Sequence, residues 1–379
     1  MLPAGRLAVR LVRNGLRYQY LRLRGKPGRP QAISLEVTRR CVCHCVMCNI
    51  WKVPRQDPEL SLDEWVDLLS DPLLADVREL DITGGEPFLR DDLVSLMIAV
   101  CRLKESRLKR LRSVAITTNG VLTHRVAPGV EEMLAVMSGY GLELVIVCAL
   151  DAVGPLHDEI RRYPGAWPAV RQTIDELVGL RGEWPNLVVG VKTTVLPLNV
   201  DALEGIADYA RERDLFTIIS PAIVTPGRYL NIDRAPDLEL SPAEQLRLAA
   251  FYEGGHSEWT YHARTVAGYL RTGRVKRPCT CGFNYFFVRS NGEVYLCPLL
   301  DESAGNLRSK SLGDLLGSDR ARRIRRQVGR APQCAHCTEP GLERYSLPYQ
   351  GFAYLGELVR VGPRRFRELH RHLGLDKYL

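Results

Sequence analysis

The stretch Cys41-Val42-Cys43-His44-Cys45-Val46-Met47-Cys48 places four cysteines within eight residues of a 379-residue chain. It follows Ile33–Val37, a short segment of the length expected for a strand. Cys41, Cys45 and Cys48 have the spacing Cys-x3-Cys-x2-Cys, and their thiolates are soft ligands that suit iron–sulfur clusters or zinc. Three ligands on one loop can hold three corners of a four-iron cluster and leave one iron open, as in catalytic metal sites. We therefore expect a catalytic metal centre at the end of the first strand.

Outward from this loop, short apolar runs alternate with segments of helical periodicity. The expected strands are Ile33–Val37, Glu79–Ile82, Val114–Thr117, Leu144–Leu150, Leu187–Val195 and Phe216–Pro221. The expected helices between them are Ser61–Leu69, Leu93–Leu103, Val130–Met137, Trp167–Leu180 and Leu203–Arg211. Strands that alternate with helices predict an α/β fold with a parallel sheet and helices outside it. The pattern alone does not choose between an open sheet and a barrel.

The ends of the next strands carry further motifs in a fixed order. Gly84-Gly85-Glu86-Pro87 follows the second strand, Thr117-Thr118-Asn119-Gly120 the third, and Leu150-Asp151 the fourth. With the cysteine loop, these motifs resemble those of the radical S-adenosylmethionine (radical SAM) enzymes, and their context at strand ends makes the match specific. The resemblance implies a partial (β/α)6 TIM-like barrel, with the ligand site at the carboxyl ends of the strands.

The resemblance also implies roles for individual residues. The four-iron cluster that binds S-adenosylmethionine would be held by Cys41, Cys45 and Cys48. The residues expected to contact S-adenosylmethionine itself are Met47, Gly84, Gly85, Glu86, Pro87, Asn119 and Asp151. Two alternatives stay open at the loop: Cys43 as a competing ligand, and Met47 as a packing residue. Ala149 stands where many relatives have a serine that contacts the ribose.

A second group of cysteines lies in residues 279–337. Cys281, Cys297, Cys334 and Cys337, with Gly292 between the first two, resemble the C-terminal SPASM module of radical SAM enzymes. No cysteine follows Cys337, which matches the shorter twitch form, a small α+β module with one auxiliary [4Fe-4S] cluster. The turn signal Asn291-Gly292 predicts a hairpin that brings the first two ligands together. Cys279 is an alternative first ligand, and a closed four-cysteine zinc site is an alternative to the cluster.

The charge is concentrated at the N-terminus. The net charge is +8, and residues 1–30 carry eight basic residues and no acidic one, so the rest of the chain is balanced. A protein that coats nucleic acid with its whole surface is therefore not expected. The expected division of the chain is a basic segment 1–30, a radical SAM barrel 31–225, a helical connection 226–275, an auxiliary cluster module 276–345 and a basic tail 346–379.

The basic segment has the pattern of an amphipathic helix. One stripe consists of Arg6, Arg10, Arg13 and Arg17, and the apolar side consists of Leu7, Leu11, Val12 and Leu16. The favoured interpretation is a helix packed on the barrel, with arginine stems that cover apolar surface. The alternative is peripheral contact of residues 1–25 with an anionic membrane surface. No RNA-binding motif is present, so a nucleic-acid partner is not expected.

Neither a secretory signal nor an apolar run long enough to span a membrane is visible, which predicts a cytoplasmic location, with the inner membrane surface as the candidate contact. Thiols stay reduced there, so the isolated Cys101 and Cys148 are expected to be buried singly.

The resemblance implies an oxidoreductase or mutase that acts on a small-molecule or lipid-like substrate, helped by an electron donor such as flavodoxin or ferredoxin. A peptide or protein maturase is the alternative, disfavoured because the first strand follows the basic segment without room for a peptide-recognition domain. An alternative of another class is a non-catalytic zinc scaffold.

Overall fold

The computed structural model describes residues 4–53, 58–255, 260–277, 279–373 and 375–378. One nine-stranded sheet runs through it in the order β6-β5-β4-β3-β2-β1-β7-β8-β9. The strands are β1 Ala32–Thr38, β2 Glu79–Gly84, β3 Ser113–Thr118, β4 Glu143–Ala149, β5 Leu187–Val195, β6 Phe216–Pro221, β7 Tyr285–Val288, β8 Glu293–Tyr295 and β9 Gly305–Asn306. Strands β1 to β6 are parallel and adjacent in chain order, which confirms the predicted α/β fold with a partial barrel.

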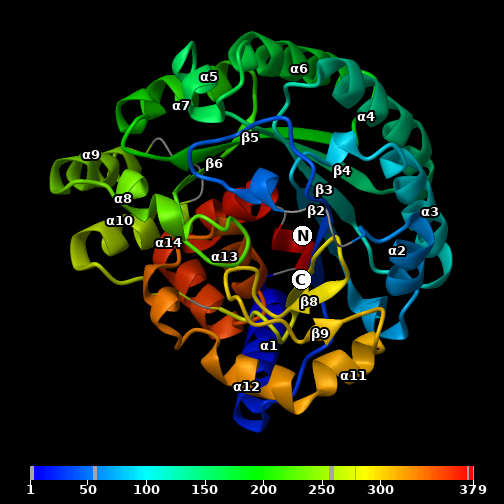
Figure 1. Cartoon of the computed structure of the whole chain (residues 1–379). Helices are drawn as coiled ribbons and strands as arrows, with labels where there is room; N and C mark the ends of the chain where they lie inside the picture. Colours follow the sequence, from blue (N-terminus) through cyan, green and yellow to red (C-terminus); the bar gives the residue numbers. More distant parts are fainter. Residues whose placement is uncertain (1–3, 54–57, 256–259, 278, 374, 379) are drawn as a thin grey trace.

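Helices cover the outer side of the curved sheet (Figure 1). The helices that follow strands in the barrel are α2 Leu62–Leu69, α3 Leu93–Ser106, α4 Thr123–Met137, α5 Leu156–Arg161, α6 Ala166–Leu180 and α7 Leu203–Glu212. The later helices are α8 Ala235–Leu238, α9 Pro242–Glu253, α10 Thr260–Thr272, α11 Leu312–Gly317, α12 Asp319–Gln327, α13 Pro340–Ser346 and α14 Gly351–Leu373. The described short 3-10 helices include η1 Ile50–Lys52 and η3 Pro87–Leu89.

The six expected barrel strands lie within two residues of their predicted bounds. The predicted start of one helix was wrong, because α4 begins at Thr123 and continues through Pro128. Proline costs a helix one backbone hydrogen bond, but Val126 and Val130 are fully buried on this helix, and burial of its apolar face outweighs that loss. Cys101 and Cys148 are both fully buried, as predicted.

The auxiliary module continues the barrel sheet. Strand β7 pairs in parallel with β1, with Ala32 opposite Tyr285 and Leu35 opposite Val288. The predicted hairpin is present: β7 and β8 are antiparallel, and Gly292 has a φ of +87°, which suits its place in the turn. A single cluster of buried apolar side chains extends through both parts of the chain. The second cysteine group is therefore fixed to the barrel by shared sheet and shared core.

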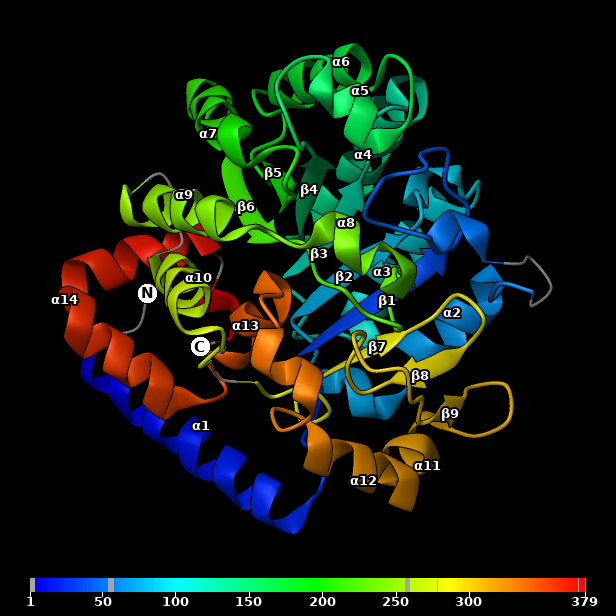
Figure 2. The ribbon, with the colours of Figure 1, turned by 60° about the vertical axis from the view of Figure 1, so that its left-hand side comes forward.

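The N-terminal helix α1, Ala4–Arg24, packs side by side with α14 (Figure 2). The two helices approach so closely that a Cβ on Gly351 would lie 1.6 Å from the backbone oxygen of Leu11. Leu7 and Leu11 are buried in this contact with Tyr354 and Phe366 of α14, whereas Tyr18 and Leu21 are buried against Phe283 and Tyr349. The predicted apolar side was wrong at Leu16, which is 61% exposed, because the helix turns a different face toward α14.

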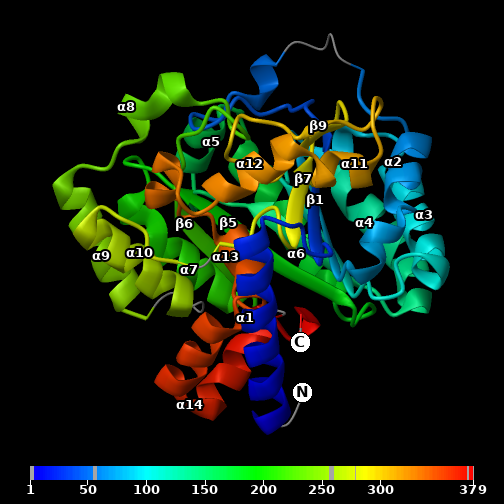
Figure 3. The same ribbon diagram turned by 90° about the horizontal axis from the view of Figure 1, so that it is seen from below.

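This helix pair lies at the end of the molecule opposite the cysteine loop (Figure 3). The chain beyond α14 returns to the barrel through Lys377, whose ammonium donates to Ser113 at the start of β3 and pairs with Glu143 at the start of β4. These residues mark the amino ends of the parallel strands, whereas the cysteine loop follows the carboxyl end of β1. Within the described residues, no helix is both long and apolar enough to cross a bilayer.

Candidate functional site

The cysteine loop, residues 41–48, is held by backbone contacts to distant segments. The Val46 N–H donates to the carbonyl of Ile160 in α5 at 3.0 Å. The side-chain amide of Asn231 donates to the carbonyl of Met47 at 2.8 Å and is buried. A loop fixed in this way holds its side chains in place before any ligand binds, which lowers the entropy cost of binding.

Two glycines let the end of β2 approach the start of this loop. The N–H of Gly85 donates to the carbonyl of Thr38 at 2.8 Å. A Cβ on Gly84 would lie 2.2 Å from that same carbonyl oxygen, and a Cβ on Gly85 would lie 2.2 Å from the carbonyl oxygen of Arg40. Any larger residue would push the two segments apart, so the glycine pair sets the distance between the cysteine loop and the second strand.

A cavity opens at the carboxyl ends of the strands, lined by most of the residues that the sequence predicts for the site. These residues are Cys41, Cys45, Cys48, Met47, Gly84, Gly85 and Asn119, and Cys43 lines the cavity with them. In the described part of the chain, no three Cys, His, Asp or Glu side chains already surround a point where a single metal ion would sit. Thiols that face a shared cavity fit a larger iron–sulfur cluster, since they surround space rather than one ion.

Glu86 and Pro87 lie behind the cavity wall. The carboxylate of Glu86 is fully buried and accepts hydrogen bonds from the hydroxyl of Thr118 at 2.8 Å, the N–H of Asn119 at 2.7 Å and the N–H of Phe88 at 3.1 Å. Glu86 therefore ties the end of β3 to the end of β2. Burial raises the pKa of Glu86 to about 7, although its three donors favour the ionised form.

This pKa gives a testable pH dependence. Above pH 7 the Glu86 carboxylate is ionised and accepts all three hydrogen bonds; below pH 7 it gains a proton and loses an acceptor. We expect the affinity of the reconstituted protein for S-adenosylmethionine to fall by up to about tenfold per pH unit below pH 7. Equilibrium dialysis of wild type and Glu86→Gln measures this. The variant should bind weakly with little pH dependence in this range, and parallel curves for the two proteins would contradict the prediction.

Asp151 is also outside the cavity lining, but it positions a residue that sequence reasoning missed. The fully buried Asp151 carboxylate pairs with Arg161 at 2.6 Å and accepts the N–H of Thr194 at 2.9 Å. Arg161 lines the cavity, and its guanidinium donates to the sulfur of Cys45 at 3.7 Å. A fixed cation at this place suits a carboxylate or a thiolate. The signal in the sequence was an arginine on the buried side of the short helix after the fourth strand.

A second set of missed residues lies where the barrel meets the auxiliary module. Lys192 of β5 approaches Glu339 at 3.7 Å, and the hydroxyl of Tyr229 donates to the other oxygen of Glu339 at 3.4 Å. The Arg228 guanidinium donates to the hydroxyl of Thr83 at 2.6 Å. All of these side chains line the larger cavity. Lys192, Arg228 and Glu339 contribute charged groups to it, and Tyr229 and Thr83 contribute hydroxyl groups. Lys192 was detectable as a charged residue inside an apolar strand.

The second cysteine group surrounds a smaller cavity, lined by Cys279, Cys297, Cys334 and Cys337. Cys281 lies beside it, with its thiol in contact with the thiols of Cys279 and Cys297. The Arg277 guanidinium donates to the sulfur of Cys337 at 2.6 Å and to the carbonyl of Glu339 at 2.7 Å. Four thiols around one cavity fit a closed four-iron cluster. Arg277 and Glu339 thus link this cavity to the larger one.

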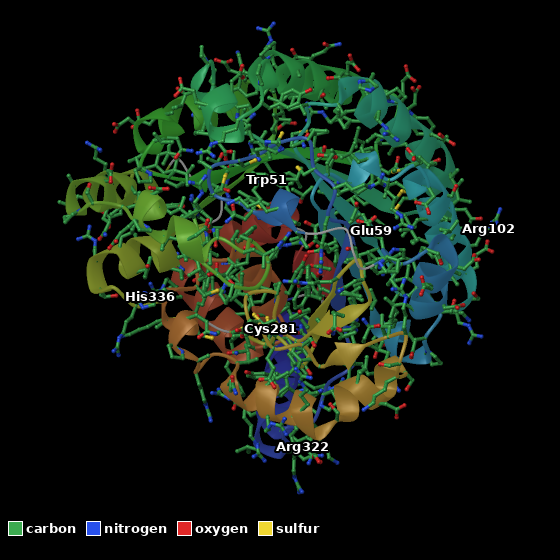
Figure 4. All side chains as sticks on the ribbon, viewed as in Figure 1. Trp51, Glu59, Arg102, Cys281, Arg322 and His336 are labelled. Atoms are coloured by element: carbon green, nitrogen blue, oxygen red, sulfur yellow. The ribbon has the colours of Figure 1, made fainter. Side chains whose placement is uncertain are left out.

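Both sites lie inside the ring of helices. Figure 4 places Trp51, which follows the cysteine loop, and Cys281 toward the middle of the molecule, whereas Arg102 and Arg322 lie at its rim. The indole N–H of Trp51 donates to the carbonyl of Cys48 at 3.1 Å, and its ring stacks on His44 at 4.2 Å. These contacts tie the 3-10 helix η1 to the cysteine loop.

Comparison with protein families gives two matches. The family model of the radical SAM superfamily matches residues 35–235. The model of the iron–sulfur cluster-binding domain named SPASM matches residues 279–338.

Individual proteins are similar over most of the chain. The sporulation killing factor maturation protein SkfB of Bacillus subtilis is 21% identical over 326 residues, which cover 85% of this chain and 72% of that protein. The AdoMet-dependent heme synthase of Methanosarcina barkeri is 26% identical over 310 residues, 76% of this chain and 82% of that protein. The crystal structure of Streptococcus suis SuiB bound to the precursor peptide SuiA has the same fold, with a TM-score of 0.58 at 16% identity over 83% of this chain and 71% of that one.

Proposed function

Because the chain belongs to the radical SAM superfamily and has a SPASM iron–sulfur domain, we propose that it modifies a peptide or protein substrate, and that both iron–sulfur sites take part. When bound, the reduced first cluster supplies the electron that splits S-adenosylmethionine into methionine and a 5′-deoxyadenosyl radical, which removes a hydrogen atom from the substrate. Cys41, Cys45 and Cys48 would hold that cluster. A flavodoxin or ferredoxin is the proposed electron donor.

The observation that carries the proposal is the closeness of the two sites. The larger cavity is lined by the cysteine loop and by Glu339, which lies two residues after the proposed auxiliary ligand Cys337. A substrate in this cavity would therefore lie between the two clusters. Glu339, Lys192 and Tyr229 would orient its polar groups, and they hold protons at defined atoms, the Lys192 ammonium and the Tyr229 hydroxyl.

Four thiolates of the second cysteine group would hold the auxiliary cluster with no iron open to the substrate, and when bound it would supply a one-electron acceptor for an oxidation. The cavity lining favours Cys279, Cys297, Cys334 and Cys337 as its ligands. The sequence resemblance favours Cys281 in the first position instead, and Cys281 is in contact with this set.

The comparisons support a peptide substrate more than the small molecule expected from the sequence. A curated relative that matches 85% of this chain is named a maturation protein, and the similar SuiB structure contains a precursor peptide. The cavity lining is mostly apolar, and the charged groups Lys192, Arg228 and Glu339 are set into it, which suits the side chains and backbone amides of a peptide. A small-molecule substrate is the second candidate, favoured by the heme synthase, whose length this chain covers more completely.

Anaerobic reconstitution followed by a substrate screen tests the proposal. We expect a brown protein with about eight irons, in two four-iron clusters, that forms 5′-deoxyadenosine from S-adenosylmethionine under reduction. Short peptides encoded near the gene and metabolite extracts serve as parallel substrates, and mass spectrometry detects a loss of two hydrogens or another change. A peptide product supports the proposal. A product from metabolites alone supports the second candidate, and a colourless zinc protein contradicts both.

A further inference from the structure

The outward face of α1 carries a row of exposed apolar side chains. Val9, Leu16, Tyr20 and Leu23 are 70%, 61%, 54% and 86% exposed. Their spacing of seven, four and three residues places them in one line along a helix. The line extends about 21 Å, at about 1.5 Å per residue. We call these four residues the outer row. They are distinct from the buried face that packs on α14.

A row of arginines runs beside the outer row. Arg6, Arg13 and Arg17 lie three residues before Val9, Leu16 and Tyr20, so that each arginine is one step around the helix from an apolar side chain. The exposed cations along this side of α1 are Arg6, Arg10, Arg13, Arg17 and Arg24. Within the described part of the chain none of the five forms an ion pair with an acidic side chain, and α1 has no acidic residue. Their charge is directed to solvent.

The sequence favoured a helix packed on the barrel, with arginine stems over apolar surface, but Arg6, Arg10, Arg13 and Arg17 are exposed and the packing is confined to the inner face. That face is filled by Leu7, Leu11 and Tyr18, and its contact with α14 is tight at Gly351. The outer row has no such cover. On the side away from the arginines, the ring of Phe352 lies against Gly15, is 45% exposed and widens the apolar surface. The helix therefore has two apolar faces, of which the fold uses one.

The charge and the shape of this surface select one kind of partner. An aliphatic row beside a cationic row matches the boundary between acyl chains and anionic headgroups, where leucines insert and arginines reach phosphates. Tyr20 suits the same depth, since tyrosine gathers at membrane interfaces. A nucleic acid would pair with the arginines but leave the leucines in water. A second copy of the chain would bring two arginine rows together without acids on α1 to offset them.

We propose that the outer row and its flanking arginines dock the enzyme on an anionic lipid bilayer, with α1 lying in the plane of the surface. The docking face is at the amino ends of the strands, and the catalytic cavity opens at their carboxyl ends. The membrane would thus locate the enzyme without covering its cavity. This inference is independent of the substrate proposed above.

Vesicle sedimentation of the full-length reconstituted protein tests the docking. We expect wild type to sediment with mixed phosphatidylglycerol–phosphatidylcholine vesicles, to stay in solution with pure phosphatidylcholine, and to be released by high salt. The double variant Leu16→Glu/Leu23→Glu should bind more than about a hundredfold more weakly, because two leucines leave the acyl boundary. Arg6→Gln, Arg13→Gln and Arg17→Gln should each weaken binding about fivefold.

The matched control is Leu246→Glu on α9, where an equally exposed leucine, 71%, lies far from α1 in the sequence. It should bind vesicles like wild type. Because all the substituted side chains are exposed, melting temperatures and iron content should match in every variant. Equal recovery of wild type in the supernatant with both vesicle types would overturn the proposal. Unchanged vesicle binding by Leu16→Glu/Leu23→Glu would also overturn it. A third contradicting result would be a wild-type dimer in light scattering that does not bind vesicles and that the Leu16→Glu/Leu23→Glu variant dissociates.

Discussion

Replacing Cys45 with alanine is expected to abolish cleavage of S-adenosylmethionine. Cys45 is buried in the cysteine loop and lines the larger cavity, and its sulfur accepts a hydrogen bond from the Arg161 guanidinium at 3.7 Å. Its loss leaves two of three proposed ligands, too few to keep the first cluster. We expect about four of about eight irons to remain, and 5′-deoxyadenosine to fall to the level without enzyme. Iron analysis and liquid chromatography measure the two quantities.

Cys43 provides the matched control, since it lines the same cavity two residues away. The prediction from the Cys-x3-Cys-x2-Cys spacing is that Cys43→Ala keeps all its iron and its cleavage activity. If Cys43→Ala instead lost the cluster while Cys45→Ala kept it, the assignment of ligands on this loop would be wrong. Cys101→Ala, at a fully buried thiol outside both cavities, controls for loss of a thiol in the core.

Replacing Cys337 with alanine is expected to distinguish the role of the auxiliary cluster from that of the first cluster. Cys337 lines the smaller cavity and receives a hydrogen bond from Arg277 at 2.6 Å. The variant should lose about four irons and the electron paramagnetic resonance signal of the auxiliary cluster. It should still form 5′-deoxyadenosine from S-adenosylmethionine, because the cysteine loop is unchanged, but it should release no modified substrate. Product at the wild-type rate would contradict an electron-transfer role for the second cluster.

A pair of variants decides whether Cys279 or Cys281 is the first auxiliary ligand. Cys279→Ala should lose the auxiliary irons if the thiols that line the cavity are the ligands. Cys281→Ala should lose them if the ligand is the one favoured by the family resemblance. The two thiols are in contact, so a shift of the signal without loss of iron would identify the substituted residue as a neighbour of the cluster.

Local pattern in the sequence was sufficient for the alternation of strands and helices and for the first cluster loop, whereas the barrel was implied by the family resemblance. The first four barrel strands are each followed by a motif, and parallel strands in chain order bring those ends to one edge. The spacing of Cys41, Cys45 and Cys48 lies within one loop, so no long-range contact is needed to read it. The Asn291-Gly292 turn was predictable for the same reason.

Contacts between segments that lie far apart in the sequence could not be predicted from local pattern. In the sequence, nothing distinguishes Arg161 from the other arginines; its contact with Cys45 depends on how α5 packs. Glu339 reaches Lys192 because β7 pairs with β1 and places the auxiliary module beside the barrel. The place of Glu339 in the larger cavity, beside the module that carries the second cysteine group, depends on these pairings. The sequence gives the charge and polarity of a residue. The cavity that its side chain faces depends on packing against segments that lie far away in the sequence.

The helix α1 shows the division most clearly. The sequence determined that residues 4–24 form an amphipathic cationic helix, because apolar and basic residues recur at helical spacing. It could not choose between two apolar faces, since Leu11 and Leu16 have equal hydrophobicity. The tertiary structure made the choice: Gly351 lets α14 approach at Leu11 and buries that face, which leaves Leu16 in solvent. Helical spacing is a local property, whereas burial requires a partner of matching shape.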